Sequence, residues 1–260
     1  MNVVVRGFFW IVTMKFKINS CTLVLALLTA PFVHADAHGK WSYSGESAPD
    51  KWGTLNHAFA TCEKGFNQSP IDIQKTIKGE LPPLSMSFNA KDKSIINNGH
   101  TIQIDVNDGD HLVVDGTTFT LKQFHFHTPS ENLIDGRTYP LEVHFVNSSP
   151  QGELAVIGVM IDEGQENPVI ADILNNIPAR INQAQKLSKP LALANLMPGD
   201  KHYYRFSGSL TTPPCTEGVR WLVMKDPVYA SKAQIAAFEA ALAQKNSRPV
   251  QPLNGRVVIH

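Results

Sequence analysis

Three histidines lie in two short apolar segments, and their spacing suits metal binding. His125 and His127 alternate with phenylalanines, and His144 stands within the apolar run 141–146. Side chains two positions apart on a β-strand point to the same face. If the two strands are neighbours, three imidazoles converge on one point. Three protein ligands with an open fourth position are typical of a catalytic zinc ion rather than a structural one.

Two polar residues stand two positions before histidines of this set. Gln123 precedes His125 and Glu142 precedes His144, so each lies on the same strand face as its histidine. We expect Gln123 and Glu142 to accept a hydrogen bond from the second ring nitrogen, as the partners of metal-bound histidines usually do. The alternative is a pair of core strands whose histidines are merely hydrogen-bonded. That alternative must explain three histidines and two suitably placed partners at once.

The elements that would carry these residues are mostly strands. Segments rich in β-branched and aromatic residues lie between clusters of Gly, Asn, Asp and Pro, and we predict strands over 101–106, 112–114, 118–127, 141–146, 154–161 and 221–224. Asn167 and Pro168 begin a predicted helix that ends at Pro178, and Ser231 with Gln234 forms a capping box for another. The pattern indicates an α+β, predominantly β, fold centred on a sheet, and it leaves the connectivity open.

The composition favours one globular domain. The chain has 260 residues, of which 43% are hydrophobic and 18% are charged, which is enough for a single large core. Its formal net charge is zero and its pI is near 7.2, so it lacks the positive field of a nucleic-acid-binding protein. No repeat, low-complexity tract or linker divides the sequence after Trp41.

Residues 1–35 are predicted to be a secretory signal peptide. Lys15 and Lys17 precede the apolar run 21–28, and small residues at 33–35 suit cleavage. Met14 is an alternative start, because 1–13 form a second apolar segment ahead of the signal. The apolar run is too short to span a bilayer comfortably. We therefore expect 36–260 to be a periplasmic or secreted domain without stable membrane insertion, with a membrane anchor as the alternative.

Removal of the signal leaves two cysteines, Cys62 and Cys215. An even count in a protein bound for an oxidising compartment suggests one disulfide. It would close a loop of about 150 residues, for which the chain-entropy model allows at most roughly 5 kcal/mol of stabilisation. Two unpaired buried thiols are the alternative.

Several separated sequence blocks resemble those of the α-class carbonic anhydrases and occur in the same order. The histidine strands belong to the first of these matches, which comprises QFHFH (123–127), SEN (130–132) and EVHFV (142–146). The others are QSPIDI (68–73), NNGH (97–100), GSLTTPPC (208–215) and RPVQPL (248–253). Together they cover the chain from about Trp41 to its end, so the resemblance concerns a whole domain.

The resemblance implies a large, mostly antiparallel twisted sheet with short surface helices and zinc at the bottom of a conical cleft. It also implies reversible hydration of carbon dioxide to bicarbonate and a proton, by attack of a zinc-bound hydroxide. In carbonic anhydrases zinc is known to lower the pKa of its bound water to about 7. By the resemblance, Thr211 accepts the proton of the hydroxide and donates its own to ionised Glu131, while Thr212 orients the outgoing bicarbonate.

The resemblance assigns further residues around the metal. His127 is expected to donate to the backbone carbonyl of Asn246, and His100 to carry the proton of each turnover toward solvent. The disulfide is expected to hold the threonine pair over the metal, since relatives carry a bridge at the same places. Phe206 stands where many relatives have tyrosine, so one hydrogen bond behind the threonine pair is in question. An apolar wall for carbon dioxide is expected at Val146, Val156, Leu210, Val219 and Trp221.

Two other functions fit parts of the pattern. A zinc esterase or hydrolase would need a carboxylate placed as a general base, and the sequence has no HExxH-type signature. A non-catalytic, carbonic-anhydrase-like zinc-binding domain would characteristically have lost a ligand histidine, and all three are present. The histidines His57, His111 and His202 are predicted to be ordinary turn residues. A homodimer is a candidate assembly, because bacterial relatives are often dimers.

Overall fold

A computed structural model of the protein describes residues 40–89 and 92–260. The predicted signal peptide and the alternative start at Met14 lie outside the described residues. Within the described part, no helix is long and apolar enough to cross a membrane.

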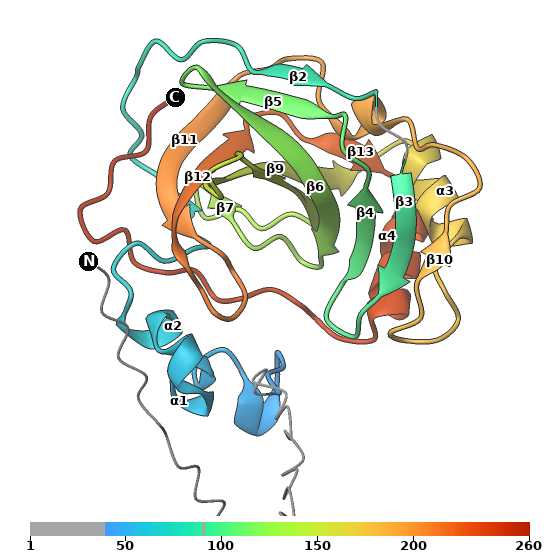
Figure 1. Cartoon of the computed structure of the whole chain (residues 1–260), viewed down its shortest axis with the longest axis horizontal. Coiled ribbons are helices and arrows are strands. Elements are labelled where there is room, and N and C mark those ends of the chain that lie inside the picture. The colour runs from blue at the N-terminus through green and yellow to red at the C-terminus, as the bar shows by residue number, and fades with distance from the viewer. Residues whose placement is uncertain (1–39, 90–91) are drawn as a thin grey trace, which may run out of the picture. The chain divides into compact units, whose positions relative to one another are not determined.

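An 11-stranded sheet forms the body of the protein (Figure 1). Eight of its strands follow one another in the order β10 (Gln185–Lys186), β3 (Asp92–Asn97), β4 (Ile102–Val106), β6 (Thr117–His127), β8 (Leu141–Ser148), β9 (Leu154–Glu163), β12 (Glu217–Met224) and β11 (Tyr203–Ser209). Off this path, β13 (Val228–Ala230) pairs with β9, β5 (His111–Val114) with β6, and β2 (Ser85–Ser87) with β5. A separate parallel pair consists of β1 (Asp72–Ile73) and β7 (Leu133–Ile134).

The sheet is mostly antiparallel, as predicted. Parallel pairing within it occurs among the described strands where β12 and β13 meet β9. The ladder shifts register between Leu121 and Gln123, where β6 pairs with β8. Beyond that irregularity the two strands run in step to the end of β6, and this stretch holds the histidines.

The two faces of the central strands bury different clusters. Phe124 and Phe126 of β6 are fully buried on one face, together with Phe145 of β8 and side chains of the two longer helices. The opposite face carries the histidines, and a second cluster around Val156 and Trp221 lies there. The alternation of histidine and phenylalanine along β6 therefore separates a polar site from the main core.

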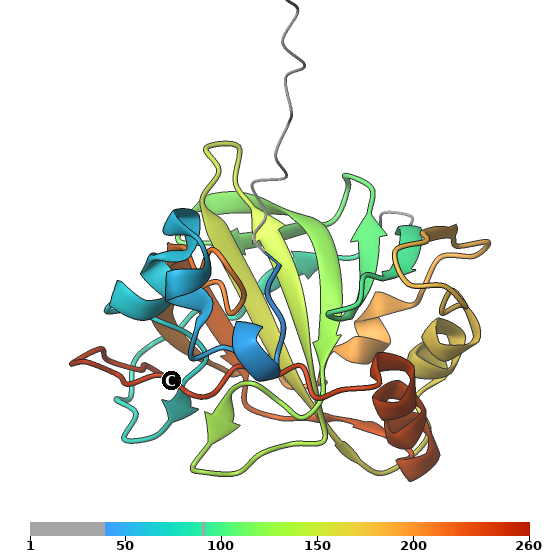
Figure 2. The same cartoon turned by 90° about the horizontal axis from the view of Figure 1, so that it is seen from below.

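Both predicted helices are present. They are α3 (Pro168–Asn175), whose N-terminus is capped by the Asn167 side chain, and α4 (Lys232–Leu242), which begins with the complete Ser231–Gln234 capping box. The yellow α3 and the red α4 lie together beside the end of the sheet that holds β3 and β4 (Figures 1 and 2). The remaining helices are short: 3-10 turns at Gly45–Ser47, His57–Phe59 and Leu193–Leu196, and the single α-turns α1 (Trp52–Leu55) and α2 (Thr61–Lys64).

All six predicted strands are confirmed within a few residues, as β4, β5, β6, β8, β9 and β12. The sequence did not predict the remaining strands of the large sheet, β2, β3, β10, β11 and β13, or the β1–β7 pair. The edge strand β11 pairs with β12 along its whole length from Tyr203 to Ser209, and it leads directly to the segment that carries Thr211.

Candidate metal centre

Strand register brings the three predicted histidines together. In the antiparallel β6–β8 pair, His125 stands opposite His144, and His127 stands opposite Glu142. Directly opposed residues of such a pair lie on the same face, so all three imidazoles project from one side of the sheet. One nitrogen atom of each ring lies within 4.8 Å of those of the other two, a grouping that could hold a metal ion.

The second nitrogen of each ring meets an oxygen acceptor. The pairs are His125 Nδ1 with Gln123 Oε1 at 2.8 Å, His127 Nδ1 with the Asn246 carbonyl at 2.8 Å, and His144 Nε2 with Glu142 Oε1 at 2.9 Å. These acceptors are the ones that the sequence predicted. They fix which ring nitrogen carries the hydrogen. The nitrogens left free for coordination are Nε2 of His125, Nε2 of His127 and Nδ1 of His144.

The free nitrogens suit a metal cation. His127 is buried, and among the described residues its Nε2 atom has no hydrogen-bond partner. Burial lowers the pKa of His127, and burial together with the neighbouring rings lowers the pKa of His125 well below its ordinary value. Both rings are therefore neutral at physiological pH, which is the form that binds a metal. Three neutral imidazoles are a donor set that zinc takes in catalytic sites, so these residues fit zinc.

Glu142 is fully buried, and both of its oxygens accept hydrogen bonds. Oε2 accepts from the backbone amides of Glu131 and Asn132 at 2.8 and 2.9 Å, and Oε1 accepts from the Asn132 side chain at 2.8 Å and lies 2.9 Å from His144 Nε2. Burial alone would raise the pKa of Glu142, but His144 and the hydrogen bonds outweigh burial and lower it. A side chain at Gly158 would not fit here, because its Cβ would lie 2.9 Å from Glu142 Oε1.

Glu131 lies between the histidines and Thr211. Its Oε2 atom is 3.5 Å from His127 Nε2 and 3.9 Å from His144 Nδ1, and its Oε1 atom accepts from the backbone amide of Arg248 at 2.9 Å. Burial raises the pKa of Glu131 to about 7, against the opposing effects of His144 and of hydrogen bonds from the Arg248 amide and the Thr211 side chain. The Thr211 side chain therefore lies near enough to the Glu131 carboxylate to affect its pKa.

The predicted apolar wall is a continuous cluster on the histidine face. Its buried and partly buried members include Val146, Val156, Leu210, Val219 and Trp221. The Trp221 ring stands edge-on to the His144 ring, with 4.9 Å between the ring centroids, so the cluster borders the metal site. Phe206 stacks on Trp221 at 6.0 Å and contributes packing where a tyrosine would also offer a hydroxyl.

His100 lies against an aromatic side chain that the sequence analysis did not single out. Its ring stacks on Trp41, with 3.8 Å between centroids and 13° between planes. The turn before it is held by the Asn98 side chain, which accepts from the amides of His100 and Thr101 at 2.9 Å each. The ring is half-buried, and burial lowers the pKa of His100.

The other predicted turn histidines lie apart from this cluster. His111 is not a turn residue but the exposed first residue of β5, because the strand begins one position earlier than predicted. His57 begins a 3-10 turn, and the exposed His202 pairs with Asp200.

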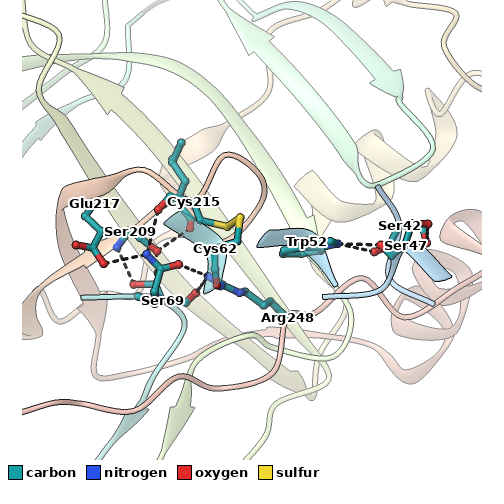
Figure 3. Close-up of a disulfide and its surroundings, with 11 residues drawn as sticks. Ser42, Ser47, Trp52, Cys62, Ser69, Ser209, Cys215, Glu217 and Arg248 are labelled. Atoms are coloured by element: carbon teal, nitrogen blue, oxygen red, sulfur yellow. Dashed lines mark hydrogen bonds between the residues drawn. A yellow bond between two sulfur atoms is a disulfide. The ribbon is translucent and has the colours of Figure 1, made fainter. Parts of the chain in front are cut away.

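The disulfide between Cys62 and Cys215 is present, with an S–S distance of 2.09 Å (Figure 3). It joins α2 to the segment that follows the threonine pair. Cys215 also donates its backbone amide to the carbonyl of Thr212 at 2.9 Å. The bridge thus holds the segment that carries Thr211 and Thr212, as expected.

Two buried polar residues make contacts that the sequence analysis did not anticipate. Asn132 is fully buried. Its side chain donates to Glu142 and accepts from the amide of Ile71 at 3.1 Å. Arg248 is 2% exposed, and its guanidinium donates to several oxygens near the disulfide. Each belongs to a block of the family resemblance, and that position was the available signal.

Comparisons with known proteins give consistent results. The chain matches the profile of eukaryotic-type carbonic anhydrases over residues 47–260. A Pectobacterium carotovorum protein named carbonic anhydrase is 48% identical over 247 residues, covering 95% of this chain and 100% of the relative. The α-carbonic anhydrase of Thermovibrio ammonificans, solved with the inhibitor sulfanilamide, is 43% identical with a TM-score of 0.84, covering 86% of this chain and 100% of its own. The Photobacterium profundum α-carbonic anhydrase is 49% identical with a TM-score of 0.81, covering 85% and 100%.

Proposed function

The chain belongs to the eukaryotic-type, or α, carbonic anhydrase family, and from that premise we propose that it hydrates carbon dioxide reversibly at a zinc ion held by His125, His127 and His144. Family membership makes the chain an enzyme whose substrates are carbon dioxide and bicarbonate. The observation that carries the finer proposal is the arrangement of the imidazoles. Three free ring nitrogens converge, while the second nitrogen of every ring is already engaged.

The residues around the histidines prepare them for a metal. When bound, zinc supplies a positive charge that makes a nucleophile available from water at neutral pH, as is established for carbonic anhydrases. Gln123, Asn246 and Glu142 accept the other ring N–H groups and thereby fix the tautomers and the orientation of the rings. Of the three acceptors, Glu142 is the charged one, so its effect on ligand basicity should be the largest.

Thr211 and Glu131 orient the nucleophile. A threonine hydroxyl has one hydrogen to donate, and an ionised carboxylate can only accept. If Thr211 gives its hydrogen to Glu131, only its lone pairs remain to face the nucleophile, so it must accept the nucleophile's hydrogen. This arrangement turns a lone pair of the nucleophile toward carbon dioxide. Glu131 is expected to be ionised beside a metal cation, which opposes the effect of burial.

The substrate site combines an apolar wall with a polar exit. Carbon dioxide carries no charge and has little polarity, so the cluster around Val146, Val156 and Trp221 offers it a suitable surface beside His144. Bicarbonate is charged, and the Thr212 side chain is placed on the same segment as Thr211 to orient it. Leu210, directly after β11, and Val219 of β12 complete the wall.

His100 is the proposed route for the proton. Hydration releases one proton in each turnover, and that proton must reach solvent before the next cycle. Histidine is the side chain whose ordinary pKa lies nearest neutrality, so it can accept and release this proton. The half-burial of His100 lowers its pKa, which favours release of the proton.

We place the mature protein, residues 36–260, in the periplasm or outside the cell. A disulfide is typical of an oxidising compartment. The predicted signal peptide supports the same location. A homodimer remains a proposal that a sedimentation experiment would test.

The proposal is tested by zinc analysis and a carbon dioxide hydration assay on the mature protein. We expect one zinc per chain and hydration activity. His144→Ala should lose most of both, because it removes a ligand and leaves the buried Glu142 without its imidazole partner. His111→Ala is the matched control, because it removes an exposed histidine from β5. Full zinc and activity in His144→Ala would refute the ligand assignment.

The same measurements separate the alternatives. Zinc binding without any hydration of carbon dioxide would favour a non-catalytic domain. Ester hydrolysis alone would favour a zinc esterase. The three intact histidines and the engaged acceptors behind them argue for the hydration activity.

A further inference from the structure

Arg248 is a buried arginine whose side chain reaches across the base of the disulfide (Figure 3). Its Nη1 atom donates to Gln68 Oε1 at 2.9 Å and to the Ser69 carbonyl at 2.8 Å, and its Nη2 atom donates to the Cys62 carbonyl at 2.8 Å. The guanidinium also lies 5.6 Å from the centre of the Trp52 ring. The fork of the guanidinium therefore spans three acceptors of the segment 62–69.

That segment is tied to the segment that carries Thr211. Cys62 is bonded to Cys215, and Gln68 Nε2 donates to the Cys215 carbonyl at 3.1 Å. Ser69 and Ser209 form a reciprocal pair, since the amide of each donates to the hydroxyl of the other at 2.9 and 3.1 Å. The segment 62–69, which accepts the hydrogen bonds of the Arg248 side chain, is thus joined to Ser209 and to Cys215, the two ends of 209–215.

The backbone of Arg248 makes the second connection. Its amide donates to Glu131 Oε1 at 2.9 Å, and the Thr211 side chain acts on the same carboxylate, whose pKa it lowers. Arg248 therefore contacts Glu131 through its backbone amide. Its side chain contacts the segment 62–69, which is joined to the segment that carries Thr211.

We propose that Arg248 is a positioning residue for the Thr211–Glu131 pair: its guanidinium fixes the backbone amide that keeps the Glu131 carboxylate in line with the Thr211 hydroxyl. The inference rests on the proposed function, because it concerns how the nucleophile is oriented. Arg248 touches neither substrate nor metal ligand in this role. It acts through the geometry of two other residues.

The planar guanidinium is required for this role. Arginine presents donors in a rigid fork, whereas the lysine ammonium is a single flexible point of charge. A lysine at position 248 could reach one or two of the acceptors now held by separate guanidinium nitrogens. Small misplacements of orienting groups can lower rates by up to about 100-fold. We therefore expect Arg248→Lys to leave the zinc content unchanged and to lower kcat/KM for hydration about 10- to 100-fold.

Arg256→Lys is the matched control. The Arg256 guanidinium also donates to backbone carbonyls of this region, namely those of Gln68, Ser207, Pro252 and Leu253. It makes no contact with Glu131 among the described residues. Both lysine variants should lower the midpoint of thermal unfolding, but only Arg248→Lys should lower kcat/KM per zinc-loaded molecule. If Arg248→Lys fails to fold, Gln68→Met removes one acceptor of the guanidinium and should give a smaller fall in the same direction.

A double-mutant cycle with Thr211→Ala tests the route of the effect. If Arg248 acts through the Thr211–Glu131 pair, Arg248→Lys should cause no further loss of kcat/KM once Thr211 is absent. Multiplying losses would overturn the inference, as would parent kcat/KM in folded, zinc-loaded Arg248→Lys.

Amide hydrogen exchange supplies a readout that does not depend on activity. The amide at position 248 should exchange faster in Arg248→Lys, while that of Gln251, which donates to the Pro70 carbonyl at 2.8 Å, should change little. Equal slowing or acceleration at both amides would indicate a general structural role and refute the positioning role. An inactive zinc-loaded parent protein would instead refute the proposed function, and the exchange comparison would still decide the inference.

Discussion

Replacement of Glu142 by glutamine should weaken either the fold or zinc binding, because no orientation of the amide satisfies all four donors around it. One carboxylate oxygen accepts from the Asn132 side chain and lies 2.9 Å from His144 Nε2, and the other accepts from the amides of Glu131 and Asn132. Asn132 cannot turn its own amide around without losing the bond that it accepts from Ile71. The substitution changes the shape of the site very little, so the effect is electrostatic.

The two orientations have different consequences. If the glutamine oxygen faces His144, its NH2 group confronts two buried backbone N–H groups, and each unsatisfied donor costs about 1–3 kcal/mol, or roughly 2–6 kcal/mol of folding free energy. If the NH2 group faces His144 instead, Nε2 must become an acceptor. The ring hydrogen then moves to Nδ1, the nitrogen proposed to bind zinc. A change of this kind in a ligand's partner commonly costs about 10- to 100-fold in metal affinity, which is roughly 1.4–2.8 kcal/mol.

Two measurements distinguish these outcomes. Urea unfolding of the metal-free protein reports the folding cost, and competition with a coloured chelator reports the zinc dissociation constant. Gln123→Leu is the comparison, because Gln123 supports His125 from a partly exposed position where water can replace it. Its effect on both quantities should be smaller. Glu142→Gln protein that kept both the parent unfolding free energy and the parent zinc affinity would refute the argument.

Three other predictions concern separate steps. In His100→Ala, kcat should fall in dilute buffer while kcat/KM stays near the parent value, because kcat/KM reports only the steps through departure of bicarbonate. Added imidazole should restore kcat. Equal falls in kcat and kcat/KM without rescue by imidazole would exclude the shuttle. Replacing Cys62 and Cys215 by serine should lower the unfolding free energy by up to about 5 kcal/mol, since the bridge joins residues 153 positions apart. The effect on activity per folded molecule should be smaller. An unchanged urea midpoint would contradict this prediction. Metal-free Glu131→Gln protein lacks the carboxyl whose raised pKa of about 7 acts in the opposite direction over this pH range. In that variant burial lowers the pKa values of His125 and His127 from the ordinary 6.5. The unfolded chain then binds more protons, so the urea midpoint should fall as the pH drops below about 6.5. A midpoint that rises over that range would show that these rings are not buried in the neutral form.

The sequence predicted the part of the site that depends on local periodicity. A period of two along β6 and β8 places the histidines on one face and the phenylalanines on the other, whichever strands lie beside them. The same period places Gln123 and Glu142 behind their histidines. The starts of the two longer helices were predictable for a similar reason, because the Ser231–Gln234 capping box is complete within four residues. The end of α3 was not, since the helix stops at Asn175 and not at Pro178.

Strands whose stability comes from their neighbours were not predictable in this way. β3 has the sequence DKSIIN and β11 the sequence YYRFSGS, and neither alternates cleanly between apolar and polar residues. Their hydrogen bonds to β4 and β12 make them strands, and those partners are fixed by the whole sheet. Propensity is a weak guide where a strand is decided by cross-strand packing.

The least predictable contacts are those that join the site to distant parts of the chain. Arg248 donates to Glu131, Gln68 and Cys62, which lie 117, 180 and 186 positions away. An isolated arginine followed by proline carries no pattern that reveals these partners, and its type would ordinarily predict exposure. A buried guanidinium is tolerated here because its donors meet oxygens that are already fixed by the disulfide and the Ser69–Ser209 pair. The polar support of the metal site therefore depends on the folded scaffold, whereas the ligand strands themselves can be recognised from the two short segments 123–127 and 142–146.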